Sequence, residues 1–88
     1  MRDIKKLYQI YKEEKTESDR LDTLWEQDPE NEILEAAWDD AYTRYHNRAW
    51  ELAEAIEIFT HGKVNKTVAM QIIDKKPQEL AALIERIA

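Results

Sequence analysis

Apolar side chains recur every three or four residues along the first part of the chain. They stand at Ile4, Leu7, Tyr11, Leu21 and Trp25. This is the spacing of one face of an α-helix, and no Gly or Pro interrupts it between Asp3 and Glu26. We therefore predict a helix over about residues 3–25.

A second stripe with the same spacing follows, formed by Leu34, Trp38, Ala41, Tyr45, Leu52, Ile56 and Phe59. Between the two stripes, Asp28 can cap free N–H groups and Pro29 suits the first helical position. The second helix should end near Phe59, because Gly62 stands where a left-handed C-terminal residue is expected. A short turn would pair the two helices as an antiparallel hairpin.

The remaining segment predicts two short helices. Asn65 can cap a helix of roughly residues 66–74, and Lys76-Pro77 marks the start of a last helix. Such short helices are not stable alone, so they should dock on the hairpin. Their expected docking residues are Val68, Ile72, Leu80, Leu83 and Ile87. The predicted fold is all-α and a single domain (1–88): a long antiparallel two-helix hairpin (3–60) closed by two short C-terminal helices (65–88).

Composition supports this class and limits the cellular setting. Hydrophobic residues make up 43% and charged residues 36% of the 88 residues, which is not the composition of a disordered chain. One Gly and two Pro leave few breaks for strands and hairpins. The chain has no Cys, no apolar N-terminal leader and no run of about 20 apolar residues. We expect a cytoplasmic protein with no membrane partner.

Charge is distributed unevenly along the chain. Residues 1–62 carry eight cationic and sixteen acidic side chains, whereas residues 63–88 carry five and three. The acidic part should repel nucleic-acid phosphate, so DNA binding would have to use the C-terminal helices. A DNA-binding regulator of that kind is one alternative function. Its signal is poor, because the last helix offers Gln78, Glu79, Glu85 and Arg86 rather than a basic face.

Two polar residues interrupt the apolar face of the first helix, Glu14 and Ser18. Antiparallel pairing around residue 28 places Glu14 opposite about residue 43. Burying an unpaired carboxylate costs several kcal/mol, so Glu14 needs a partner on the second helix. The candidates for this polar seam are Arg44, Arg48, Tyr42 and Tyr45.

Three acidic motifs offer a second alternative. They are Glu13-Glu14-Lys15-Thr16-Glu17, Glu32-Ile33-Leu34-Glu35 and Glu51-Leu52-Ala53-Glu54. Carboxylates three apart on a helix can share a divalent cation. The order of the motifs resembles that of the all-helical MazG-type nucleotide pyrophosphatases, and the resemblance implies magnesium held between helices. It covers about a dozen residues, and the second motif lacks the aspartate expected at its end. The hairpin register also separates Glu14 from both acidic pairs of the second helix.

The outer face of the second helix carries a polar arc that contains one large aromatic residue. Its members are Asp39, Thr43, His46, Trp50, Glu54 and Glu57. A tryptophan among polar residues is typical of an interface anchor. Either the C-terminal helices or a second chain could cover Trp50. His46 has no second histidine on its helix, and His61 suits the negative end of the helix dipole.

No set of residues favours covalent or cofactor chemistry. Ser18 is the only serine and no histidine is predicted beside it, and a single Gly excludes a phosphate-cradling loop. We therefore predict a non-enzymatic protein–protein interaction module that needs no cofactor or metal and forms homo-oligomers. Besides a second copy of the chain, we expect a protein partner, whose identity the residues do not indicate. In size and charge it is similar to small accessory and inhibitory proteins of phages and mobile elements.

Overall fold

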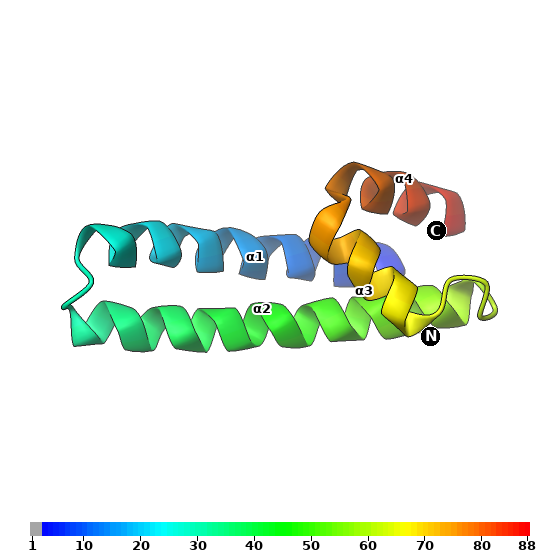
Figure 1. Cartoon of the computed structure of the whole chain (residues 1–88). Helices are drawn as coiled ribbons and strands as arrows, with labels where there is room; N and C mark the ends of the chain where they lie inside the picture. Colours follow the sequence, from blue (N-terminus) through cyan, green and yellow to red (C-terminus); the bar gives the residue numbers. More distant parts are fainter. Residues whose placement is uncertain (1–2) are drawn as a thin grey trace.

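A computed structural model describes residues 3–88 and confirms the all-α fold. The helices are α1 (Ile4–Gln27), α2 (Glu32–Phe59), α3 (Lys66–Lys75) and α4 (Pro77–Ile87). The long helices α1 and α2 run antiparallel and side by side, and α3 and α4 gather at the end of the hairpin far from its turn (Figure 1). The molecule is elongated, with principal extents of 46 × 24 × 19 Å.

The register of the hairpin agrees with the sequence-based prediction. Trp25 stacks on Trp38 near the turn, with ring centroids 6.0 Å apart. At the other end, Ile4 is buried in one cluster with Leu52 and Ile56. In the part of the chain that the structure describes, no helix is both long enough and apolar enough to cross a membrane.

The turn differs from the prediction in the residue that starts the second helix. Asn31, not Asp28, is the N-cap of α2: its side-chain oxygen accepts from the N–H groups of Ile33 (3.0 Å) and Leu34 (3.1 Å). Asp28 instead closes α1, and its carboxylate accepts from Asn31 Nδ2 at 3.2 Å. Pro29 lies in the turn itself, not at the first position of α2. The chain needs these extra turn residues to reverse direction between two closely packed helices.

The C-terminus of α2 turns sharply through two residues with positive φ. Gly62 has φ +81°, as predicted, but His61 before it also has φ +54°. The Gly62 N–H donates to the Glu57 carbonyl (2.9 Å) and the His61 N–H to the Ile58 carbonyl (3.1 Å), which is a Schellman motif. His61 therefore adopts a left-handed backbone conformation that is unfavourable for most L-amino acids. The sequence did not reveal this, since only glycine marks such positions reliably.

The main apolar core lies where α3 and α4 cover the hairpin. Its large members include Ile4, Tyr11, Leu52, Ile56, Ile73, Leu80, Leu83 and Ile84. Ala49, Ala53 and Ala69 are also fully buried, and their short side chains let α2 and α3 approach closely. Asn65 caps α3 and Pro77 opens α4, as predicted. Val68, which was expected to dock, is exposed instead, because Ala69 and Ile73 form the buried face of α3.

Tyr11 connects the hairpin to α3. Its ring packs against Tyr45, with centroids 5.7 Å apart, and its hydroxyl donates to the Ile73 carbonyl at 3.4 Å. The side chain is buried, and burial is the main reason that the pKa of the Tyr11 hydroxyl is raised above its ordinary value. The neutral phenol is therefore the form that the fold stabilises.

Two isoleucines of α2 provide a matched test of the core. Ile56 is fully buried, whereas Ile58 is 71% exposed. Ile56→Ala should lower the free energy of unfolding by about 2–5 kcal/mol, because it removes buried apolar surface and leaves a cavity. Ile58→Ala should change it by less than about 0.5 kcal/mol. Urea denaturation of the two variants measures both, and equal losses would contradict the placement of the core.

The raised pKa of Tyr11 predicts a loss of stability in alkali. Its contribution is fully present below the pKa of an unfolded tyrosine, about 10, and is lost as the pH rises through the higher folded-state value. Tyr11→Phe should therefore weaken the fall in unfolding free energy between pH 9 and pH 11, by up to about 1.4 kcal/mol per pH unit. Denaturation at several pH values measures this slope. Tyr8→Phe is the control, and an identical slope in Tyr11→Phe and the wild type would contradict the assignment.

Candidate interaction surface

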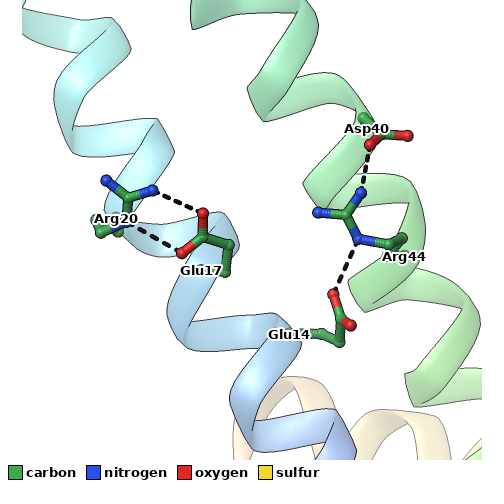
Figure 2. A network of polar contacts seen from close by, with 5 residues as sticks. All are labelled: Glu14, Glu17, Arg20, Asp40 and Arg44. Atoms are coloured by element: carbon green, nitrogen blue, oxygen red, sulfur yellow. Dashed lines mark hydrogen bonds and ion pairs between the residues drawn. The ribbon is translucent and has the colours of Figure 1, made fainter.

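Glu14 pairs with a residue of α2, as predicted, and that residue is one of the four candidates, Arg44. Its Oε2 lies 3.1 Å from Arg44 Nε, and Arg44 also pairs with Asp40 one turn earlier on α2. Figure 2 shows the guanidinium of Arg44 between the two carboxylates, with Glu14 reaching across from α1. Arg48, another candidate, instead donates to Glu51 on its own helix at 3.1 Å. Arg44 is therefore the cross-helix partner of Glu14.

This polar seam is less buried than the sequence suggested. The side chain of Glu14 is 25% exposed and that of Arg44 is 46% exposed. The pKa of Arg44 is raised, chiefly by its hydrogen bond to Glu14. Ser18, by contrast, is buried. Because water reaches the ion pair, it contributes little to the stability of the fold.

Carboxylates of the first and third acidic motifs are engaged in separate ion pairs. On α1, Glu17 pairs with Arg20 at 2.7 Å, and this hydrogen bond lowers the pKa of Glu17. On α2, Glu51 pairs with Arg48, and Glu54 pairs with Lys66 of α3 at 3.2 Å. Within residues 3–88, no three His, Asp or Glu side chains lie close enough together to hold a metal ion. The motifs of the MazG-like pattern are therefore not brought to one site.

A row of rings lies along α2 and is here called the aromatic ladder: Trp38, Tyr42, His46 and Trp50. Consecutive members are four residues apart, and their ring centroids are separated by 5.6, 6.2 and 6.5 Å. Tyr42 is 45% exposed and Trp50 is 41% exposed. The ladder therefore forms a continuous aromatic surface that is partly open to solvent.

A groove runs between the ladder and α3. Its volume is about 470 Å³, and Tyr42, His46 and Trp50 line one side while Met70 and Asp74 line the other. Lys66 of α3 places its Nζ 5.0 Å from the centre of the Trp50 ring. The C-terminal helices thus cover Trp50 on one side only. The sequence left open whether the C-terminal helices or a second chain covers Trp50. The C-terminal helices cover part of it, and 41% of the residue stays exposed.

The other predicted surface residues differ in what they can offer a partner. Asp39 is exposed, whereas the hydroxyl of Thr43 donates to the Asp39 carbonyl at 2.9 Å and is occupied within the helix. Glu54 is engaged by Lys66. Sequence reasoning placed Trp38 in the seam and Trp50 on the outer face, and it missed Tyr42 as the ring between them. The signal was present as the four-residue spacing of the rings.

A double-mutant cycle tests the Glu14–Arg44 pair. Glu14→Gln and Arg44→Gln, alone and together, should show a coupling energy below about 1 kcal/mol, because the pair is partly solvated. Glu13→Gln combined with Arg44→Gln is the matched control and should show no coupling. Thermal or urea unfolding supplies the four free energies. A coupling of about 3–5 kcal/mol, the scale of a buried pair, would contradict the observed exposure.

Comparisons with known proteins add no further constraint. The chain matches no protein-family model, no curated protein and no solved structure. What can be inferred about function therefore rests on the residues and their arrangement. Among these, the aromatic ladder and its groove combine exposed rings with a concave surface, as binding sites commonly do.

Proposed function

We propose that the chain is a non-enzymatic protein–protein interaction module, a small accessory or inhibitory protein that docks through the aromatic ladder. The observation that carries this proposal is the partial exposure of Tyr42 and Trp50 within one continuous row of rings. Aromatic side chains bury a large area while losing few rotatable bonds, and they dominate the energy of protein interfaces.

The position of the ladder also suits docking. It lies on a long, regular helix, so its rings are held at fixed spacing before a partner arrives. Tyr42 and His46 are stacked with an interplanar angle of 13°, and Trp50 meets His46 edge to face at 89°. A surface ordered in advance loses less conformational entropy on binding than a flexible one. The groove beside α3 adds a concave contact for a partner side chain.

The alternative functions have weaker support. A DNA-binding regulator would have to use the C-terminal helices, and the exposed residues of the last one, α4, include Gln78, Glu79, Glu85 and Arg86. This set offers two carboxylates and one guanidinium to a phosphate backbone, which favours repulsion. A metal-dependent nucleotide hydrolase would need its carboxylates to converge. Instead, Glu17, Glu51 and Glu54 each pair with a separate cation.

Self-association is part of the same proposal, since a second copy could also cover the ladder. Charge restricts how two copies could meet. The chain has a net charge of −6, and most of its acidic residues lie in the hairpin. If two copies pair through the ladder, we expect them to meet near Trp50 and the basic residues of α3. Contact near the turn would bring acidic residues of both copies together.

Removing the ladder tests the proposal. Tyr42→Ala combined with Trp50→Ala should weaken partner binding by about 30-fold or more, the effect of losing a hot spot of about 2 kcal/mol. Because both rings are partly exposed, the cost in unfolding free energy should be below the 3–5 kcal/mol of a buried aromatic, near about 1–2 kcal/mol. Affinity capture from the native host, sedimentation and thermal melting measure partner binding, assembly and stability.

Ile58→Ala is the matched control, since it removes an exposed apolar side chain from the same helix outside the ladder. It should retain every partner that the wild type captures. If the ladder variant and the control behave alike in capture and sedimentation, the ladder is not the interaction surface and the proposal is wrong.

A further inference from the structure

One half of the hairpin lacks the third helix that covers the other half. We define the turn end as residues 13–44. In this segment only Ser18, Leu21 and Ala41 are buried, although it supplies more than half of α1 and almost half of α2. Figure 1 shows that α3 and α4 end well before the turn. The turn end is therefore a two-helix surface with no further layer.

Aromatic residues form part of this uncovered surface. Trp25 stacks on Trp38, and Trp38 in turn contacts Tyr42, so the rings continue from the turn into the groove beside α3. The indole Nε1 of Trp25 is buried and has no hydrogen-bond partner in the described part of the chain. At the covered end, the corresponding space beside Ala49 and Ala53 is filled by α3, with Ala69 and Ile73 buried in the same cluster. A helix is thus the shape that this side of the hairpin already accommodates.

Carboxylates accompany these rings at a regular spacing. Asp22 stands three residues before Trp25, Glu35 three before Trp38, and Asp39 three before Tyr42. Residues three apart on a helix are surface neighbours, so each ring has a carboxylate beside it. None of the three carboxylates forms an ion pair within residues 3–88.

The charge of the whole turn end has the same sign. It contains twelve acidic and three cationic residues, a net charge of −9. The three cationic residues, Lys15, Arg20 and Arg44, are already paired with carboxylates of the same segment. A second copy would bring a surface of equal negative charge, and nucleic acid or an anionic membrane would also be repelled. Charge complementarity therefore selects a cationic occupant.

We propose that the turn end binds a cationic amphipathic helix of a partner protein, on the side of the hairpin that carries the aromatic ladder. Its aliphatic face would cover Trp38 and Tyr42, and its Lys or Arg residues would face Asp22, Glu35 and Asp39. This inference rests on the proposed interaction function and names the chemistry of the partner. Laying the apolar face of a helix in a groove is a common mode of peptide recognition.

A direct binding measurement with a defined probe tests this inference. The probe is a labelled peptide of about 14 residues, roughly four turns, with Leu at helical spacing and Lys elsewhere. One control peptide has the same composition without the helical spacing, and another has Glu in place of Lys. Fluorescence anisotropy with the full chain should show at least about 10-fold tighter binding of the amphipathic cationic peptide than of the same-composition control, and no binding of the acidic one.

Variants of the chain locate the binding surface. Tyr42→Ala should weaken binding of the cationic peptide about 10-fold or more, and so should the triple variant Asp22→Asn, Glu35→Gln, Asp39→Asn. A matched triple variant, Glu51→Gln, Glu79→Gln, Glu85→Gln, removes the same charge outside the turn end and should stay within about 3-fold of the wild type. Circular dichroism confirms that each variant remains helical.

Several outcomes would overturn the inference. Equal binding of the two cationic peptides would indicate only non-specific charge attraction, and binding unaffected by Tyr42→Ala would place the site elsewhere. Sedimentation that shows a dimer dissociated by Tyr42→Ala would assign the surface to a second copy. The proposed function fails separately, when the Tyr42→Ala, Trp50→Ala chain captures the same partners as the wild type, so the two failures can be distinguished.

Discussion

The structure depends on one constraint: two long helices are packed against each other, and the two short helices that follow cover only one end of the pair (Figure 1). Helices α1 and α2 contain 24 and 28 residues, whereas α3 and α4 contain 10 and 11. A helix rises about 1.5 Å per residue, so each C-terminal helix covers less than half of the hairpin's length. The covered end therefore contains the apolar core, and the turn end remains a two-helix surface.

This division decides how each end is stabilised. At the covered end, Leu52, Ile56 and Leu80 are fully buried. The removal of their apolar surface from water supplies most of the stability there. At the turn end, few residues are buried, and capping by Asn31, the Trp25–Trp38 stack and the Glu14–Arg44 pair hold the helices together. The second set is weaker, since partly solvated ion pairs contribute at most about 1 kcal/mol each. The turn end can therefore exchange solvent for a partner at little cost to the fold.

The sequence predicted the hairpin and its register because both follow from periodicity. The expected position opposite Glu14 was about residue 43, and the observed partner is Arg44. Local details were harder to predict. Asp28, Pro29 and Asn31 all favour a helix start, and only the geometry of the reversal selects Asn31. The left-handed conformation of His61 is imposed by the Schellman motif, and no residue preference marks it in advance.

The aromatic ladder was missed for a geometric reason. A step of four residues turns 40° beyond a full turn of an α-helix, since each residue turns about 100°. Three such steps carry the row from Trp38, beside Trp25 of the other helix, to Trp50 on the outer face. Sorting residues into an inner and an outer face therefore divided one surface into two. Rows that drift across a helix become visible only when neighbouring rings are compared directly.

In the proposed complex, the ladder and the negative charge would act at different stages of the encounter with a partner. The field of the turn end extends about 8–10 Å at physiological ionic strength, so it attracts cationic surfaces before contact and raises the association rate. The rings would act only at contact, where burying Tyr42 and Trp38 would slow dissociation. A partner that is cationic but not apolar would arrive quickly and leave quickly. A partner that is apolar but not cationic would associate slowly, and stable docking therefore requires both properties in one helix.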